Sequence, residues 1–300
     1  MIISAKSFEE LHKKAKIKIA EKACYQLVLK VDCDINEIDS NFVATYSNDA
    51  RKWQAPKKPE DLVINHGQYL FSNGDPFKFI KEELKKKPDS NRALFSMIDM
   101  EKIYKSNDDP IPSFLNLQFG LLEKDKLLVS AYFRALEIHN FLPINIAEIC
   151  LYIKNLKDYF VTIKRIKCDI YTFKAYSNPD FYCLRKAELD LIKPIPLLTI
   201  LMERNYDKII EMIRSKATTV ESVIDVTGIK NLYECLRALN KKEKISGFDG
   251  INKVFKETIK LFEAIKNKRK VFSNYKIIED KYIAIKSNLE NIEEYIQGMQ

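Results

Sequence analysis

The sequence predicts an α+β protein, in which a sheet covered by helices is followed by a helical C-terminal region. The first observation is that all ten prolines lie between Pro56 and Pro196. The chain on either side can therefore form uninterrupted helices, whereas the middle must contain turns and sheet edges. The second is that runs typical of strands flank a run typical of a helix in that middle part. The third is that the spacing of apolar residues changes to the helical period after residue 200.

The elements of the middle part follow from local patterns, taken in chain order. Residues 127–133, LLVSAYF, form a run with strand character. Residues 144–156 predict a buried helix, because they are mainly apolar and follow Pro143, a residue that favours the first turn of a helix. Residues 160–173 alternate in part with a period of two, which is typical of a strand. This order fits an α+β sheet with helices packed on one face.

Two apolar stripes predict long helices in the C-terminal region. The first falls at Ile251, Val254, Phe255, Ile259, Phe262 and Ile265. The second alternates by four and three, as in the seam of a short coiled coil or an antiparallel helical pair, and falls at Ile278, Tyr282, Ile285, Leu289, Ile292 and Ile296. The second helix either packs on its own domain or binds a protein partner, including a second copy of the chain.

Residues 218–240, TTVESVIDVTGIKNLYECLRALN, resemble a helix-turn-helix motif. A short helix, a Thr-Gly turn and a second helix would follow in order, which is the arrangement of a common DNA-reading motif. Short helices joined by glycine are also frequent in proteins that bind no DNA. The segment is therefore retained as one alternative.

Composition narrows the class of protein. The chain has 300 residues, of which 46% are hydrophobic and 31% charged, with only 7 Gly, so disorder, collagen and a disulfide scaffold are excluded. The longest apolar run, residues 195–202, is too short to cross a bilayer. The six cysteines form no CxxC pair, which favours reduced, buried thiols over a zinc site. We therefore expect a cytoplasmic protein with no membrane contact and no metal.

The net charge of +8 arises from 50 basic and 42 acidic residues that are interleaved along the chain. Such interleaving weakens an argument for nucleic-acid binding from charge alone. The densest basic cluster comprises Lys266, Lys268, Arg269 and Lys270. This cluster is typical of a solvated helix end, where the helix dipole favours cations.

Polar side chains interrupt the apolar stretch between residues 111 and 147. Ser113 follows a proline at the head of IPSFLNLQF, and YFRALEIHNFLPINIA contains Arg134, Glu137 and Asn145. A buried arginine needs an anionic partner, which a phosphate or Glu137 would supply. The amide of Asn145 is suited either to capping a helix or to reading the amide edge of a pyrimidine. Both roles remain open at this point.

Four motifs give these residues a family context. They are PDSNRALFSMID at 88–99, IPSFLNLQF at 111–119, YFRALEIHNFLPINIA at 132–147 and KAYSN at 174–178. In order and spacing they resemble the thymidylate synthase superfamily, which includes the deoxypyrimidine hydroxymethylases. The corresponding motifs of that family read PDSRR, PCHxxxQF, YQRSxDxxLGxPFNIA and HxYSN. The resemblance covers roughly residues 60–200 and implies a thymidylate synthase-like sheet and a homodimer.

The resemblance implies roles for four retained residues. Arg134 matches the arginine that holds the nucleotide 5′-phosphate, and Asn145 matches the amide that reads O4 and N3 of uracil. Tyr176 matches the tyrosine that bonds the ribose 3′-hydroxyl. Arg92 matches one of two arginines that reach across the dimer to the same phosphate. Together they imply part of a pocket for a pyrimidine deoxynucleotide.

Several positions depart from the family pattern. Ser113 lies where the family has its catalytic cysteine, and a serine without an adjacent base is a poor nucleophile. The family's phosphate-loop arginine, its catalytic glutamate and its folate-binding residues are not recognisable. The other changed positions are Phe114 for histidine, Asn91 for arginine, Ala135 for serine, Glu137 for aspartate, His66 for tyrosine and Lys174 for the ribose-binding histidine. By the same resemblance we expect Glu137, His66 and Lys174 to contact the nucleotide, and Ser113 to take the catalytic position.

The sequence thus leads to three hypotheses about function. The first is a catalytically degenerate thymidylate synthase-like protein, a homodimer that binds a pyrimidine deoxynucleotide. The second is an active C5 methyl- or hydroxymethyltransferase on dUMP or a related nucleotide, which alone would require methylenetetrahydrofolate as cofactor. The third is a nucleic-acid-binding protein that uses the basic helical C-terminal region. The expected domains are an N-terminal lead over 1–59, a thymidylate synthase-like domain over 60–200 and a helical domain over 201–300.

Overall fold

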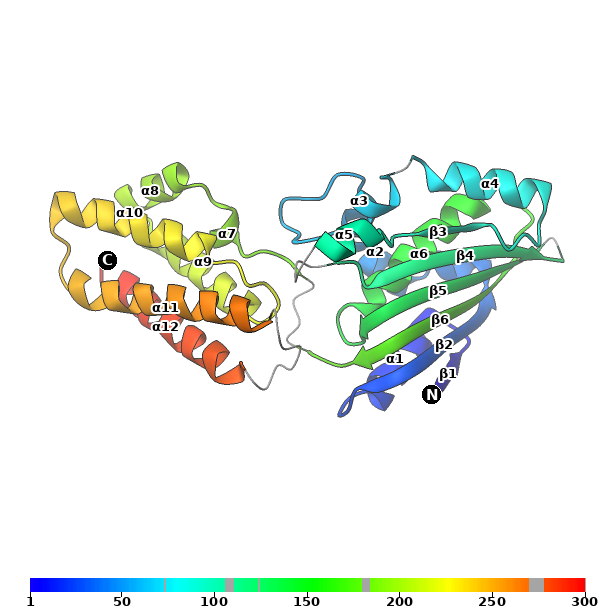
Figure 1. The fold of residues 1–300 in the computed structure, drawn as a ribbon, viewed down its shortest axis with the longest axis horizontal. Helices are drawn as coiled ribbons and strands as arrows, with labels where there is room; N and C mark the ends of the chain where they lie inside the picture. Colours follow the sequence, from blue (N-terminus) through cyan, green and yellow to red (C-terminus); the bar gives the residue numbers. More distant parts are fainter. Residues whose placement is uncertain (73, 106–110, 124, 180–183, 270–277, 300) are drawn as a thin grey trace. The chain divides into compact units, whose positions relative to one another are not determined.

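The computed structural model describes residues 1–72, 74–105, 111–123, 125–179, 184–269 and 278–299. These residues form two compact units. The first contains 1–59 and 64–179, and the second contains 60–63 and 180–300. Each unit has its own hydrophobic core. The architecture is therefore mixed α/β, with a sheet unit followed by a helical unit (Figure 1).

The first unit is organised by one mixed, open sheet of six strands in the order β1-β2-β6-β5-β4-β3. Parallel pairing joins β1 to β2 and β5 to β6, whereas the remaining neighbours are antiparallel. The strands are β1 Ile2–Ala5, β2 Cys24–Asp34, β3 Leu94–Ser96, β4 Phe114–Leu122, β5 Lys126–Glu137 and β6 Arg165–Tyr176.

Helices of the first unit cover one face of this sheet, and in Figure 1 α1, α2 and α6 lie behind the strands. The helices are α1 Phe8–Lys18, the 3₁₀ helix η1 Ile35–Asp39, α2 Asn41–Gln54, α3 Gly67–Leu70, α4 Pro76–Lys86, α5 Met100–Lys105 and α6 Leu142–Lys157. The central helix α6 is buried over most of its length. Pro143 occupies its first turn, where a missing N–H leaves no hydrogen bond unmade.

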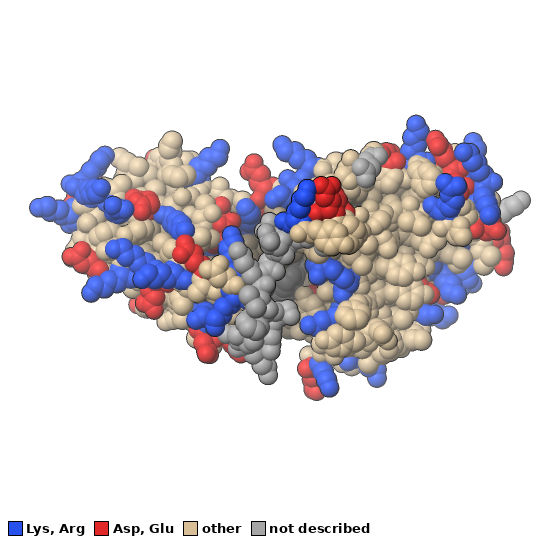
Figure 2. Space-filling model, viewed as in Figure 1, with Lys and Arg blue, Asp and Glu red and all other residues tan. Residues whose placement is uncertain are grey.

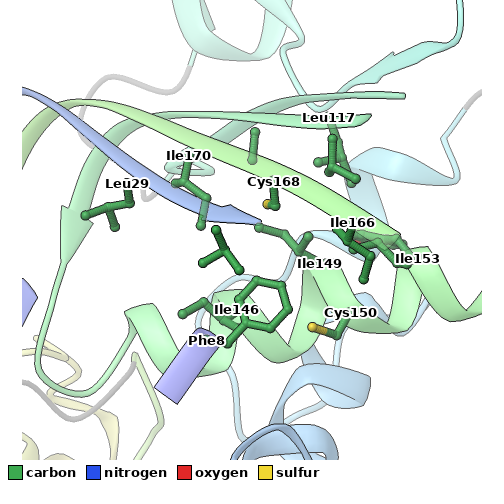
Figure 3. Packing of buried hydrophobic residues seen from close by; sticks show 14 of the residues in the cluster. Phe8, Leu29, Leu117, Ile146, Ile149, Cys150, Ile153, Ile166, Cys168 and Ile170 are labelled. Atoms are coloured by element: carbon green, nitrogen blue, oxygen red, sulfur yellow. The ribbon is translucent and has the colours of Figure 1, made fainter. Parts of the chain in front are cut away.

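Apolar side chains from both layers fill the space between the sheet and its helices. Figure 3 shows Phe8 of α1 and Ile146 and Ile149 of α6 lying beneath strand residues such as Ile170 and Leu29. All five are 1% exposed or less. Since each fully buried side chain of this size contributes about 1.5–3 kcal/mol, this layer supplies much of the stability of the unit.

The other face of the sheet carries several exposed aromatic side chains. Large side chains point outward from neighbouring strands, and Tyr25 is 56%, Tyr132 38% and Phe173 62% exposed. The rings of Tyr132 and Tyr171 stack with centroids 5.1 Å apart, and those of Tyr25 and Phe173 meet edge to face at 5.7 Å. Figure 2 shows this area as mostly uncharged, with charged side chains concentrated around its margin. We call these four aromatic residues the sheet-face cluster.

The second unit is a helical bundle. It contains α7 Glu188–Leu191, α8 Pro194–Met202, α9 Tyr206–Thr219, α10 Thr227–Glu243, α11 Phe248–Arg269 and α12 Glu279–Gln297. Both apolar stripes fall on helices, as the sequence predicts. All six positions of the second stripe are buried, and α12 packs against α9 and α11. That seam is therefore used inside the unit.

The structure differs from three expectations. Residues 1–59 are not a separate lead, because β1 and β2 extend the sheet and α1 and α2 cover it. The second unit begins at residue 180 rather than 201, because α7 and α8 pack on α9 and α10. The short helix expected at the start of 218–240 is absent, since α9 ends at Thr219 and α10 begins at Thr227. The Gly of the expected turn, Gly228, lies inside α10, where a Cβ would come 2.4 Å from the carbonyl of Leu189.

Candidate functional site

Ser113 and Arg134 meet at one end of the sheet. Ser113 directly precedes β4, and its carbonyl accepts a hydrogen bond from the backbone N–H of Arg134 at 2.9 Å. The guanidinium of Arg134 donates to the carbonyl of Pro112 at 3.1 Å and to that of Ile111 at 2.9 Å. Arg134 therefore fixes the segment that leads into Ser113. Partial burial lowers the pKa of this guanidinium, and an interaction with Tyr176 opposes that effect.

A cavity of about 240 Å³ opens beside Arg134. Its wall is formed mainly by apolar residues such as Met97, Leu115 and Pro112, and it also includes Asp99 beside Arg134. A second cavity of about 530 Å³ shares Tyr69 and residues 97–100 with it. Neither of these two cavities is lined by Asn145 or Tyr176. Cavities of 300–1,000 Å³ with a few polar groups are typical of small-molecule sites.

Tyr176 is the last residue of β6 and lies at the same end of the sheet as Ser113 and Arg134. It lies opposite Glu137 in the parallel pairing of β5 and β6, and its carbonyl accepts from the N–H of Ile138. The side chain is half-buried. Because it also interacts electrostatically with Arg134, Tyr176 and Arg134 share one neighbourhood.

Glu137 serves the backbone rather than an open pocket. Its carboxylate is 2% exposed and accepts hydrogen bonds from four backbone N–H groups, those of His139, Asn140, Phe141 and Asn178. These bonds are 2.7–3.0 Å long. A carboxylate with this many donors is well compensated in the interior. Glu137 thus holds the turn between β5 and α6, and its proposed contact with a nucleotide gains no support from this geometry.

His66 and Asn145 lie together in a buried polar cluster that also contains Glu148 and Tyr152. Glu148 is fully buried, and its two carboxylate oxygens lie 2.9 and 2.8 Å from Nδ1 of His66. The hydroxyl of Tyr152 donates to one carboxylate oxygen of Glu148 at 3.1 Å, and the Asn145 amide nitrogen lies 3.5 Å from the other. Burial raises the pKa of Tyr152 well above its ordinary value. We call these four residues the Glu148 cluster.

One atom of this cluster has no hydrogen-bond partner. Asn145 is 1% exposed, and its side-chain oxygen is buried without a donor among the described residues. The opposite amide orientation would place that oxygen against the carboxylate of Glu148, so the present orientation is the favourable one. Unpaired buried polar atoms destabilise a fold by about 1–3 kcal/mol. A ligand N–H donor would remove this deficit.

Phe114 separates the Glu148 cluster from the surroundings of Arg134. Its ring stacks on that of Phe133 at 4.4 Å and meets the ring of His66 at 5.6 Å. Phe133 points into the core, so Arg134, the next residue along β5, points to the open face. The structure therefore brings His66 and Asn145 together on the helix-covered side of the sheet. Ser113, Arg134 and Tyr176 lie together at the end of the sheet where β4 begins and β5 and β6 end.

Arg92 lies apart from these groups, whereas Lys174 lies on β6 two residues before Tyr176. Arg92 is exposed in the turn before β3, where Leu94 pairs with Gln118, five residues beyond Ser113. At 3.3 Å per residue this register places Arg92 more than about 17 Å along the sheet from Ser113. Lys174 is half-buried on β6, between Tyr25 of β2 and Ala135 of β5. Within one chain, Arg92 therefore does not share a phosphate with Arg134.

The sequence reasoning missed Glu148 and Tyr152. The available signal was an acidic residue in the otherwise apolar segment 142–153, three residues after Asn145 and four before Tyr152. Residues three and four apart share one face of a helix. A fully buried carboxylate in such a segment requires donors, and His66 and Tyr152 supply them.

The comparisons with family models and with curated proteins assign no family to this chain. The chain matches no protein-family model and no curated protein sequence. Among the described residues, none of the helices combines the length and apolar character needed to cross a membrane. No three His, Cys, Asp or Glu side chains in the described ranges are grouped so that they could hold a metal ion.

Proposed function

We propose that this protein is a divergent member of the thymidylate synthase-like superfamily, a homodimer that binds a pyrimidine deoxynucleotide without transferring a one-carbon group. The proposal rests first on the four motifs and on the elements that carry them. The second leads into β4, the third runs from β5 into α6, and the fourth ends β6. Parts of these three motifs meet at one end of the same sheet, as a shared nucleotide site requires.

The unpaired side-chain oxygen of Asn145 is the observation that carries nucleotide binding. Uracil presents N3–H as a donor beside O4 as an acceptor. The Asn145 oxygen would accept from N3–H and so remove its deficit in the folded chain. Such a contact requires Phe114 and the backbone around Ser113 to give the base access to the Glu148 cluster. The buried Glu148 carboxylate supports this role because it fixes the amide orientation.

Arg134 would contribute the charge for the 5′-phosphate. Its guanidinium is half-exposed and already holds two backbone carbonyls, which fixes its position. A bound phosphate would use the remaining donors of the planar group. The adjoining cavity of about 240 Å³ is mainly apolar, which strengthens a contact between opposite charges, whereas Asp99 in its lining would oppose an anion.

Homodimerisation is proposed through the sheet-face cluster. The exposed patch that includes Tyr25, Tyr132 and Phe173 carries more aromatic side chains than a solvent-exposed surface usually does. Aromatic side chains are enriched in protein interfaces. A second chain would cover this face and could bring its Arg92 toward Arg134, which one chain alone cannot do.

Ser113 argues against catalysis. Within the described residues, its side chain makes no hydrogen bond with a histidine or a carboxylate that would activate it. Phe114, in place of the family's histidine, is packed between Phe133 and His66. Tritium release from C5-labelled dUMP in the presence of methylenetetrahydrofolate should therefore not exceed background, and Ser113→Cys alone should add little. Robust turnover by the unmodified protein would establish the transferase hypothesis instead.

A thermal-shift and calorimetric screen tests nucleotide binding. The full chain is measured with dUMP, dCMP, dTMP and the 5-hydroxymethyl forms of dUMP and dCMP. A nucleotide at about 100 times its Kd should stabilise the folded chain by about 2.7 kcal/mol. Arg134→Gln and Asn145→Ala should abolish the shift, whereas Arg51→Gln, at an exposed arginine of α2, should leave it unchanged.

The absence of a shift with all five nucleotides at millimolar concentration would contradict the proposal. Equal shifts in the wild type and in both site variants would show binding elsewhere. Dimerisation is measured separately by light scattering, where Tyr132→Glu should lower the mass and Val161→Glu, at an isolated exposed residue, should not.

A further inference from the structure

Strand β3 forms an outer edge of the sheet. Among the described strands it pairs with β4 alone, and Figure 1 shows it at the margin of the sheet. The ladder extends one residue beyond β3 at each end, because the N–H of Phe119 donates to the carbonyl of Ala93 and the N–H of Met97 donates to the carbonyl of Leu115. The edge therefore runs from residue 93 to residue 97.

Alternate backbone groups of this edge face away from the sheet. Because Ala93, Phe95 and Met97 bond to β4, Leu94 and Ser96 direct their N–H and C=O groups outward. The N–H of Leu94 donates to the carbonyl of Arg92. Within the described ranges, the N–H of Ser96 and the carbonyls of Leu94 and Ser96 make no hydrogen bond. These three groups are a template for one further strand.

The edge lacks the usual protection against pairing. Exposed edge strands commonly carry lysine or proline. Residues 93–98, ALFSMI, contain neither a charge nor a proline. Leu94 is 41% exposed and Ile98 39% exposed along this segment. The segment is therefore suited to being covered by a second, partly apolar strand.

The cavity of about 530 Å³ lies beside this edge. The consecutive residues 95–100 form one part of its lining, and residues of α3 and of the start of α4 form the rest. Phe79 of α4 contributes to the wall and is 42% exposed. A strand added to β3 would place alternate side chains on the side of the cavity.

The lining of this cavity carries negative charge. It includes Asp75 and Asp99, and none of its described residues is Lys or Arg. Lys78 of α4 is exposed but does not line it. Asp75 is held in place because its side chain accepts from the N–H of Phe77 at 2.9 Å. A long basic side chain fits such a lining, since its aliphatic stem contacts apolar residues while its charged end meets the carboxylates.

We propose that β3 binds an extended segment of a partner protein by strand addition, with a Lys or Arg of that segment entering the cavity. Main-chain pairing holds the segment, and the cavity selects the side chain. A small amine would leave the edge groups of Leu94 and Ser96 unpaired. A second copy of β3 supplies only Arg92, which lies in the turn before the strand rather than between apolar strand residues.

Selection from a random peptide library displayed on phage tests the proposal with the full-length chain. Enriched peptides should share a Lys or Arg with an apolar residue two positions away, because alternate residues of a strand share one face. Asp99→Asn and Asp75→Asn should each weaken binding of the synthesised peptide at least about fivefold. Asparagine caps a helix as well as aspartate does, so Asp75→Asn keeps the start of α4. Asp158→Asn, at an exposed carboxylate that follows α6, is the control and should leave binding unchanged.

Methylation of the peptide backbone tests strand addition. N-methyl groups on the alternate amides that face β3 should abolish binding, whereas the same groups on the intervening amides should not. Equal tolerance of both sets would overturn the proposal. No enrichment, enriched peptides without a basic residue, or equal binding by both Asp variants would do the same. Enrichment of sequences that match residues 91–99 would identify a second copy as the occupant instead, and would also refute a separate partner.

Discussion

Removal of the Glu148 carboxylate should destabilise the sheet unit strongly. Glu148→Ala leaves the Nδ1–H of His66 and the hydroxyl of Tyr152 without their acceptor in a fully buried site. Each unpaired donor destabilises the fold by about 1–3 kcal/mol, and the lost side chain leaves a cavity. The expected loss is about 3–5 kcal/mol, the range found when one partner of a buried pair is removed. This is a large part of the 5–15 kcal/mol by which folded domains are stable.

The single tryptophan makes this loss measurable at the site itself. Trp53 is 1% exposed, and its ring centroid lies 4.9 Å from that of His66. Urea unfolding followed by tryptophan fluorescence therefore reports on the sheet unit and not on the helical unit. Glu82→Ala, at an exposed position of α4 in the same unit, is the control and should change the free energy of unfolding by less than about 0.5 kcal/mol.

A double variant separates polar organisation from simple packing. If His66 and Glu148 compensate each other, His66→Phe combined with Glu148→Leu should lose less stability than the sum of the single variants, because both polar partners leave together. A loss below about 1 kcal/mol for Glu148→Ala, or strict additivity in the double variant, would refute the view that Glu148 organises this cluster.

Two further predictions concern buried groups elsewhere. Burial raises the pKa of Cys33 to about 12 and also raises those of Cys150 and Cys168, so the unfolded chain loses these thiol protons first. The free energy of unfolding should therefore fall above about pH 9, by about 1.4 kcal/mol per pH unit for each thiol. Alkylation of the native chain at pH 8 should spare Cys33 while modifying half-buried Cys24. Rapid labelling of Cys33 would contradict this expectation. Gly228→Ala should lower the melting temperature because the added Cβ would overlap with the Leu189 carbonyl. Gly250→Ala should raise the melting temperature slightly, because no atom lies within 4 Å of the added Cβ. Equal effects of the two variants would rule out the close approach at Gly228.

The spacing of apolar residues along the chain was enough to locate helices and strands in which residues close in sequence share one buried face. The stripe from Ile278 to Ile296 predicts α12, and the apolar run after Pro143 predicts α6, because residues three and four apart share a helix face wherever the helix packs. The strand run at 127–133 lies within β5 for the corresponding reason, since alternate residues share a sheet face.

The tertiary structure decided what depends on residues distant in the sequence. β2 joins the sheet by pairing with β6, so the first 59 residues belong to the sheet unit although the family resemblance, which covers roughly residues 60–200, left them outside it. The resemblance implies that Arg134 and Asn145 serve one site, but only the structure shows that β5 directs Arg134 to the open face while α6 holds Asn145 on the other face, so a shared ligand has to reach both around the end of the sheet. His66 reaches Glu148 across 82 residues, and no local pattern encodes that contact. Strand pairing and side-chain hydrogen bonds join residues that are far apart in the sequence, so only the folded chain shows which residues are partners.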